Sequence, residues 1–134
     1  MSGYKHIETL IARFISGRYG SVLEIGTGRN THAAELMQRA GLRVTCSDLT
    51  IPQTTLLVPY EILDICNPTV DSTFEVECIL SIRPIEEMMA SMIAFAGILN
   101  SDLLVYHLGF EGYSYPHKIV DCGVPLCQYV TRQS

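Results

Sequence analysis

The 134-residue sequence has no apolar run long enough to cross a membrane and no signal-peptide pattern at its start. Its apolar runs are all shorter than the roughly 18 residues that suggest a membrane-spanning helix. The first ten residues, MSGYKHIETL, carry charges and lack the apolar stretch and small-residue cleavage site of a secretory signal. We therefore expect a cytoplasmic protein with no membrane partner.

The five cysteines and four histidines lack the spacings of disulfide frameworks and metal sites. The number of cysteines is odd, no C-x-x-C pair occurs, and no two histidines are four residues apart. We therefore predict no structural metal. Most of the cysteines are expected to be small core residues in a reducing compartment.

Charged residues are scarce, and their balance is acidic. They make up 17% of the chain, with a formal net charge of −5. Because a protein that coats nucleic acid needs a basic surface, this composition does not favour nucleic acid as a partner. Hydrophobic residues reach 48%, and no repeat or low-complexity segment interrupts them. We expect one domain over residues 1–134 with a sizeable core.

What the sequence does contain is an alternation of helix and strand patterns. Apolar residues recur at helical spacing over about residues 4–16, which predicts an amphipathic helix. SVLEI (Ser21–Ile25) and RVTCSD (Arg43–Asp48) are strand-like, and between them lie the turn GTGRN and a helix over HAAELMQRA, capped by Asn30 or Thr31. A strand, helix and strand in this order predict a parallel pair with a right-handed crossover.

The second half of the chain predicts three further strands, one long helix and a terminal hairpin. The strands are expected over Tyr60–Ile65, Phe74–Ile82 and Asp102–Phe110. Pro84 is expected to open the helix, whose methionine-rich stripe should pack in the core. HKIVDCG and VPLCQYVTR should form the hairpin. The predicted fold is a doubly wound, Rossmann-like α/β domain, with a mostly parallel sheet and an antiparallel terminal hairpin.

The turn after the first strand carries the features of a nucleoside site. Gly26 and Gly28 permit a tight turn and leave space for a ligand that crosses the strand ends. The helix that follows offers unpaired N–H groups to an anion. Asp48 lies twenty residues after Gly28, at the end of the next strand, where a carboxylate can accept both hydroxyls of a ribose. We therefore expect a small-molecule nucleoside cofactor.

Glu24, Gly26 and Gly28 form an E-x-G-x-G pattern that resembles the first motif of class I S-adenosylmethionine-dependent methyltransferases. The resemblance extends to Asp48-Leu49 and Asp64-Ile65, which look like the second and third motifs. The run Ile82-Arg83-Pro84 is similar to one in a family of small archaeal proteins with a shortened version of that fold. The resemblance implies S-adenosylmethionine as cofactor and a binding set of Glu24, Gly26, Thr27, Gly28, Asp48, Leu49, Asp64, Ile65 and Ser81.

The same resemblance implies a role for each acidic residue. Glu24 would organise the site near the methionine moiety, Asp48 would hold the ribose, and Asp64 would lie near the adenine amino group. Ser81 would face the reacting sulfonium. From the residues alone, other readings stay open: Glu24 as a cap for the turn amides, and Asp48 as an ordinary strand-end turn.

Departures from the family pattern leave the activity open. No Asn/Asp-Pro-Pro motif follows the fourth strand, the second helix of the fold is nearly missing, and no segment remains for a substrate lid. A methyltransferase of unknown acceptor and a non-catalytic nucleoside-binding or interaction module are both compatible with the sequence. An NAD-dependent oxidoreductase is disfavoured, because Thr31 stands at the third glycine of that fingerprint and a second nucleotide-binding half is lacking.

Two residues are candidates for the chemistry itself. Arg83 either pairs with Glu86 or Glu87, three and four residues on, or orients an anionic group of a substrate. His107 follows Tyr106 at the end of the predicted fifth strand, and its side chain titrates near neutral pH. It is either a proton-transfer group or a histidine at the rim of the core.

Overall fold

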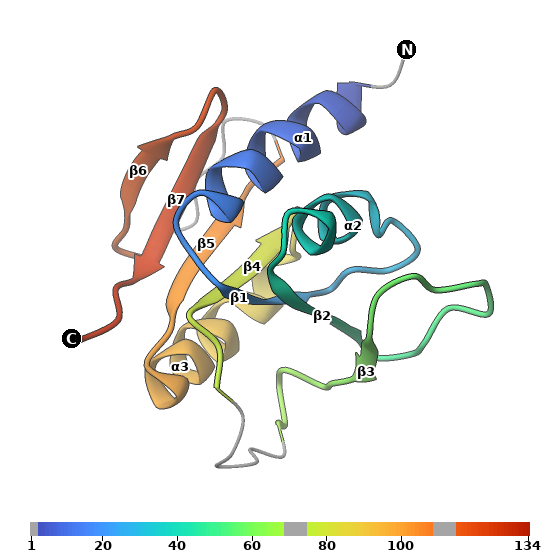
Figure 1. Cartoon of the computed structure of the whole chain (residues 1–134). Helices are drawn as coiled ribbons and strands as arrows, with labels where there is room; N and C mark the ends of the chain where they lie inside the picture. Colours follow the sequence, from blue (N-terminus) through green and yellow to red (C-terminus); the bar gives the residue numbers. More distant parts are fainter. Residues whose placement is uncertain (1–2, 69–74, 109–114) are drawn as a thin grey trace.

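The computed structural model describes residues 3–68, 75–108 and 115–134, which contain a seven-stranded mixed sheet (Figure 1). The strand order is β3-β2-β1-β4-β5-β7-β6, parallel as far as β5 and antiparallel beyond it. The elements are α1 (Gly3–Ser16), β1 (Ser21–Ile25), α2 (His32–Arg39), β2 (Arg43–Asp48), β3 (Tyr60–Ile62), β4 (Cys78–Ile82), the 3-10 helix η1 (Glu86–Met88), α3 (Met89–Leu99), β5 (Asp102–Tyr106), β6 (Lys118–Asp121) and β7 (Pro125–Val130).

The strand order reverses between β1 and β4. From β1 the chain builds outward through β2 to β3, then returns to place β4 on the other side of β1 and continues to β5. In open α/β sheets, such a reversal leaves a crevice at the carboxyl ends of the two central strands, and ligands bind there. The fold therefore predicts a ligand-binding site at the carboxyl ends of β1 and β4.

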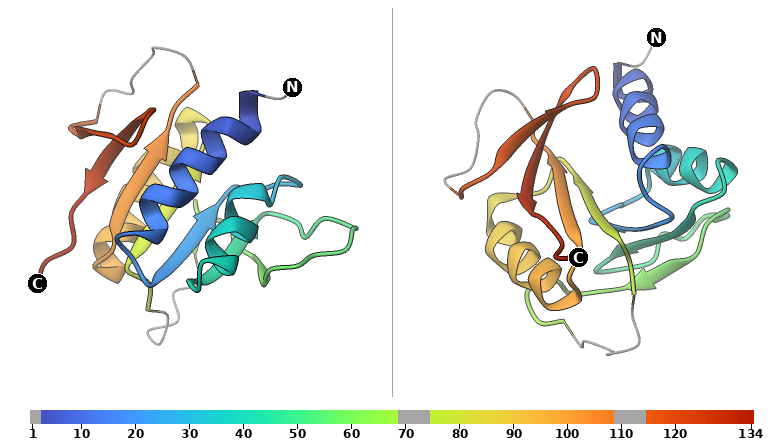
Figure 2. Two further views of the ribbon diagram at one scale, coloured as in Figure 1. Left: turned by 45° about the horizontal axis from the view of Figure 1, so that its top comes forward. Right: turned by 60° about the vertical axis from the view of Figure 1, so that its left-hand side comes forward.

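Helices cover both faces of the sheet, α1 and α2 on one and α3 on the other (Figures 1 and 2). Val22 of β1 packs in the cluster under α1 and α2, whereas Leu23 and Ile25 pack in the cluster under α3. This division follows from the strand period of two, by which successive side chains point to opposite faces. The doubly wound α/β fold predicted from the sequence is confirmed.

Helix α1 lies between α2 and the terminal hairpin. Ile11, Ala12 and Ile15 on its inner face are buried. At the hairpin turn, a Cβ built on Gly123 would lie 3.1 Å from Leu10 Cδ1, so the turn packs directly on α1 (Figure 2). The N-terminal helix and the C-terminal hairpin therefore support each other beside the sheet.

Two predicted strands are longer than the observed ones. β3 ends at Ile62 because its single neighbour in the sheet, β2, ends opposite it at Asp48. β4 begins at Cys78, opposite the starts of β1 and β5, and Glu75–Glu77 are not in the strand. Phe74, where that strand was expected to begin, lies outside the described residues. The strand-like pattern in the sequence continues beyond the end of the pairing partner in β3 and begins before the pairing partners in β4, so it overestimates the length of both strands.

The segments after β4 and β5 also differ from the prediction. The helix does not open at Pro84, because Ile85 is still extended (φ −80°, ψ 155°) and η1 begins at Glu86. β5 ends at Tyr106, opposite Ile82 at the end of β4. The expected end of that strand at Phe110 lies outside the described residues. Met89 and Met92 of α3 are buried, as the methionine-rich stripe predicts.

The cysteines are distributed as small core residues would be. Cys46, Cys78 and Cys127 are buried, Cys122 is partly buried and Cys66 is exposed. Within the three described stretches of the chain, no helix is both long enough and apolar enough to span a bilayer.

Candidate cofactor site at the carboxyl edge of the sheet

The Gly-rich turn leaves the end of β1 with two residues in the left-handed backbone region. Gly26 has φ +76° and Gly28 has φ +60°, and L-residues rarely adopt such angles. The N–H groups of Gly26 and Thr27 both donate to the carbonyl of Ser47 on β2, at 2.9 and 3.1 Å. A Cβ on Gly26 would lie 3.4 Å from Met88 Cε, so glycine at this position lets the Met88 side chain of η1 lie against the turn.

Asp48 lies at this turn, on the same edge of the sheet. Its Oδ2 accepts the Gly28 N–H at 2.8 Å, and its Oδ1 accepts the Leu49 N–H at 2.8 Å. A carboxylate has about four acceptor positions, so the two oxygens can take further hydroxyl donors. The Leu49 side chain beside it is exposed. A carboxylate held against a glycine turn is the arrangement that the sequence spacing predicted for a ribose site.

Tyr60 is a member of this cluster that the sequence did not single out. From β3 its hydroxyl donates to the Gly28 carbonyl at 2.9 Å. Burial, followed by the charge of Asp48, raises the pKa of the Tyr60 hydroxyl to about 12, so it remains a donor at neutral pH. Both polar groups of the Gly28 backbone are therefore held by side chains from neighbouring strands. The signal in the sequence was a tyrosine at the start of a strand, which is too common to be specific.

Glu24 is buried below the turn and is 3% exposed. In the described part of the chain, its Oε1 has no hydrogen-bond partner. Burial, with a second contribution from the charge of Glu8, raises the pKa of Glu24 to about 8, and a hydrogen bond with Thr27 acts in the opposite direction. Glu24 is therefore mostly protonated at neutral pH. The Thr27 and Ser47 hydroxyls both donate to the Glu24 carbonyl, at 3.4 and 2.8 Å.

Asp64 and Ile65 form a turn just after β3. Asp64 is exposed, and its Oδ1 accepts the N–H of Cys66 at 3.0 Å. Ile65 is buried in the cluster under α3. Asp64 thus lies beyond the end of β3, with one carboxylate oxygen engaged by its own turn.

Ser81 joins the ends of the two central strands. Its hydroxyl donates to the Ile25 carbonyl at 2.9 Å, and the residue is fully buried. The hydroxyl would lie 4.0 Å from a Cβ on Gly26. Ser81 therefore links the carboxyl ends of β1 and β4.

Arg83 occupies a strained corner directly after β4. Its φ is +57°, its N–H donates to the Tyr106 carbonyl at 2.7 Å, and its guanidinium lies 5.2 Å from the centre of the Tyr106 ring. Its ion pair is with Glu8 of α1, at 3.8 Å, and the predicted pairing with Glu86 or Glu87 is wrong. The extended Ile85 displaces those glutamates from the helical spacing on which the prediction depended.

His107 is held against the terminal hairpin. The residue is buried, and its Nε2 forms a hydrogen bond with the hydroxyl of Tyr129 on β7. Burial, followed by the charge of His117, lowers the pKa of His107, so its ring is neutral at neutral pH. The His107–Tyr129 contact was not predicted from the sequence, because it depends on the pairing of β5 with β7.

Glu8 of α1 and Asn30 of the Gly-rich turn form a hydrogen bond near the carboxyl edge of the sheet. Asn30 Nδ2 donates to Glu8 Oε1 at 2.6 Å, and Asn30 Oδ1 accepts the His32 N–H at 3.2 Å. Of the two predicted caps of α2, Thr31 occupies the cap position but bonds the Glu35 side chain with its hydroxyl, and Asn30, one residue earlier, accepts the His32 N–H. Helical spacing places Glu8 on the same face as the buried Ile11 and Ala12, but the sequence contains no sign of its partners.

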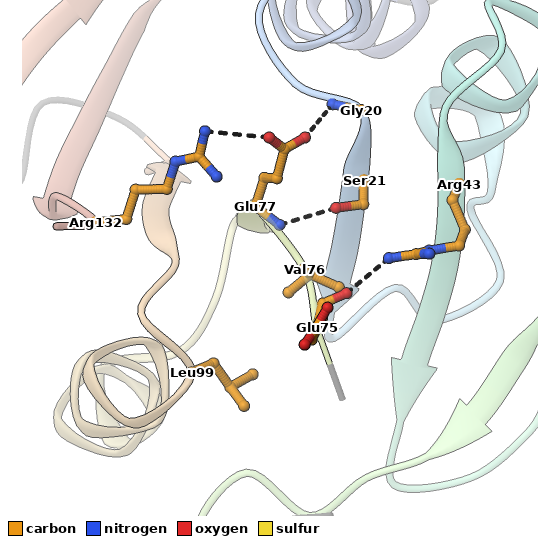
Figure 3. Close-up of a pocket in the computed structure, with 8 residues that line it drawn as sticks. All are labelled: Gly20, Ser21, Arg43, Glu75, Val76, Glu77, Leu99 and Arg132. Carbon is orange, nitrogen blue, oxygen red and sulfur yellow. Dashed lines mark hydrogen bonds and ion pairs between the residues drawn. The ribbon is translucent and has the colours of Figure 1, made fainter. Parts of the chain in front are cut away.

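A pocket of about 420 Å³ lies at the opposite, amino-terminal edge of the sheet (Figure 3). There Glu77 Oε1 accepts the Gly20 N–H, Glu77 Oε2 pairs with Arg132 at 3.1 Å, and Arg43 donates to the Glu75 carbonyl at 2.8 Å. The polar groups of this pocket mainly satisfy one another. Because ligands of open α/β sheets bind at the carboxyl edge, we interpret this pocket as a structural seam.

Comparison with known sequences gives one family. The model of the Uncharacterised protein family (UPF0146) matches residues 6–121. A curated protein from Archaeoglobus fulgidus, named UPF0146 protein, is 28% identical over 96 residues, which cover 71% of this chain and 74% of the relative.

Several of the solved structures that resemble this chain are methyltransferases. A protein assigned as a ribosomal RNA methyltransferase from Plasmodium falciparum has a TM-score of 0.62 at 14% identity, with 97% of each chain covered. A 1,6-didemethyltoxoflavin-N1-methyltransferase from Burkholderia thailandensis, solved with S-adenosylhomocysteine, has a TM-score of 0.58 at 17% identity; 96% of this chain matches 62% of that one. CalS10, an amino pentose methyltransferase from Micromonospora echinaspora solved with bound SAM, has a TM-score of 0.53 at 13% identity, with 90% and 59% covered. These similarities establish a shortened methyltransferase-type Rossmann fold.

Proposed function

We propose that this chain, which belongs to the UPF0146 family, binds S-adenosylmethionine in the crevice between the carboxyl ends of β1 and β4. The observation that carries the proposal is the contact of Asp48 Oδ2 with the Gly28 N–H, because it brings the acid of β2 to the glycine turn of β1. The structural neighbours support it, since two of them were solved with this cofactor or its demethylated product.

The residues at the crevice fit such a cofactor. Gly26 and Gly28 add no side chains of their own to the turn where a nucleoside would cross it. Asp48 would accept the ribose hydroxyls, and the exposed Leu49 beside it would cover one face of the adenine. Asp64 would reach the adenine amino group with the oxygen that its own turn does not use. Glu24, protonated and buried under the turn, would donate rather than accept at the methionine end.

When bound, the cofactor would supply a methyl group on a positively charged sulfur. The transfer of that group needs the acceptor held in line with the sulfur at short distance, and it needs little acid or base assistance. Arg83 cannot serve as a base, because its guanidinium stays protonated, but it can orient an anionic group of the acceptor. His107, which is neutral, is the candidate for a released proton.

A non-catalytic module with the same pocket is the second candidate function. It is favoured by the engagement of the groups nearest the reaction centre: the Ser81 hydroxyl bonds Ile25, and His107 bonds Tyr129. In this form the protein would bind the nucleoside for sensing or assembly. The two candidates share the ligand and differ in whether a methyl group leaves it.

Ligand class is tested by thermal shift with S-adenosylmethionine, S-adenosylhomocysteine and NAD, each at about 1 mM. A ligand that binds only the folded state raises the melting temperature by mass action. We expect a rise with both sulfur compounds and none with NAD. A rise with NAD alone, or no rise with any of the three, would contradict the proposal.

Catalysis is then tested by incubating the protein with S-adenosylmethionine labelled in the methyl group and a cell extract. Transfer of label above that of the Asp48→Ala variant supports a methyltransferase. Binding without transfer supports the module.

A further inference from the structure

Glu8 is a charged residue on the buried face of α1, and it contacts both segments that border the crevice. Its side chain is 2% exposed. Oε1 accepts Asn30 Nδ2 at 2.6 Å and lies 3.8 Å from Arg83 Nη1. Asn30 belongs to the Gly-rich turn after β1, and Arg83 to the corner after β4. One carboxylate therefore connects the turn after β1 with the corner after β4.

Each partner of Glu8 is fixed to the backbone. Asn30 Oδ1 accepts the N–H of His32, the first residue of α2. Arg83 donates its own N–H to Tyr106 and holds a φ of +57°, an angle that persists in an L-residue only where the surroundings fix it. A displacement of the Glu8 carboxylate would therefore move backbone on both sides of the crevice.

The stability of the fold gives no reason for a carboxylate at this position. Glu8 shares its helix face with Ile11, Ala12 and Ile15, which are all buried. Burial of a charge is costly even when it is paired, and an apolar residue of similar volume is often as stable or more stable. Glu8 Oε2 also has no hydrogen-bond partner in the described part of the chain. The carboxylate is explained by its two partners, not by packing.

We propose that Glu8 is a positioning residue of the cofactor site, which sets the separation between the Gly-rich turn and the corner after β4. The inference rests on the proposed function and deepens it, because it adds α1 to the machinery of the site. Arg83 is an ion-pair partner of Glu8, and the charge of Glu8 also contributes to the raised pKa of Glu24 on β1.

The test exchanges the donor and the acceptor of the Glu8–Asn30 hydrogen bond. Asn30→Asp keeps the oxygen that caps His32 but places a carboxylate against Glu8. We expect it to weaken the binding of S-adenosylhomocysteine about tenfold, the size of one lost charge-assisted hydrogen bond. In the Glu8→Gln/Asn30→Asp double variant, the new amide at position 8 donates to the new carboxylate. We expect its affinity to return to within about threefold of wild type, as coupled residues require.

Two further variants compare the effects on binding and on stability. Glu8→Gln alone removes the charge that faces Arg83, so we expect weaker binding, by about threefold, together with a loss of unfolding free energy, because one partner of a largely buried ion pair is removed. Glu61→Gln, an exposed change of the same charge on β3, should leave both quantities unchanged. All four variants are measured by calorimetric titration with S-adenosylhomocysteine and by urea unfolding.

The outcomes separate this inference from the function on which it rests. No binding by the wild type would overturn the proposed function and the inference with it. Normal binding by the wild type and by Asn30→Asp would overturn the inference alone. So would a double variant that binds no better than Asn30→Asp, because the carboxylate at position 30 would then act on the ligand directly.

Discussion

The backbone N–H of Gly28 donates to Asp48 Oδ2 at 2.8 Å, across the gap between the turn after β1 and the end of β2. The carbonyl of the same glycine accepts the Tyr60 hydroxyl from β3. Side chains from β2 and β3 therefore hold the peptide groups on both sides of Gly28. Because strands β1, β2 and β3 are parallel and adjacent, their carboxyl ends meet, and chain segments far apart in sequence lie together at one edge of the sheet.

Gly28→Ala tests whether this turn needs glycine. Its φ of +60° is unfavourable for alanine, so we expect a loss of about 1 kcal/mol in unfolding free energy and weaker binding of S-adenosylhomocysteine. Gly41→Ala is the matched control, since Gly41 also has a positive φ and has no atom within 4 Å of its added Cβ. Urea unfolding and calorimetric titration should show that both variants are destabilised and only Gly28→Ala loses affinity. Equal affinities in the two variants would argue against the turn as the site.

Tyr60→Phe removes the hydroxyl that holds the Gly28 carbonyl. We expect a loss of about 1 kcal/mol in unfolding free energy, typical of one hydrogen bond, and about threefold weaker binding of the same ligand. Tyr19→Phe is the control, because the Tyr19 hydroxyl bonds Asp102 at 2.6 Å near the opposite edge of the sheet. The Tyr19→Phe variant should lose unfolding free energy and keep the wild-type affinity for S-adenosylhomocysteine. If Tyr19→Phe weakens binding as much, the loss reflects stability and not the site.

Glu24 gives the fold a distinct dependence on pH. Its pKa rises from 4.5 in the unfolded chain to about 8 in the folded one, so the folded state binds the proton more tightly. The stabilisation from this group is complete below pH 4.5 and is lost as the pH rises to 8, by about 1.4 kcal/mol per pH unit. We expect Glu24→Gln to remove this slope from urea unfolding measured between pH 5 and 8, whereas Glu61→Gln retains it. An unchanged slope in Glu24→Gln would show that Glu24 is ionised in the folded state.

Much of the site's framework could be predicted from the sequence, because its determinants are local. The bounds of β1 and β2 follow from short apolar runs between turn residues, and the glycines fix the bend between β1 and α2. The distance of Asp48 along the chain then places it beside Gly28, since parallel strands joined by one short helix must be neighbours. The terminal hairpin at Gly123 was likewise predictable from its own turn.

Other features depend on contacts between distant segments, which no local pattern contains. β3 is short because β2 ends, and the corner at Arg83 turns because its N–H is bonded to Tyr106. The partners of Glu8 lie 22 and 75 residues along the chain, and an acidic residue in an amphipathic helix is usually read as exposed. The link from α1 to the crevice therefore became visible only in three dimensions.

The most direct test of the account is calorimetric titration of S-adenosylhomocysteine into the wild type, Asp48→Ala and Asp121→Ala. Asp121 lies exposed on β6, and the Asp121→Ala substitution removes one negative charge, as Asp48→Ala does. We predict saturable binding by the wild type and by Asp121→Ala, with affinity at least about tenfold weaker in Asp48→Ala, because a carboxylate that accepts two hydroxyls is lost. Wild-type affinity in Asp48→Ala, or an absence of binding in the wild type, would contradict a nucleoside site at the Gly28–Asp48 edge.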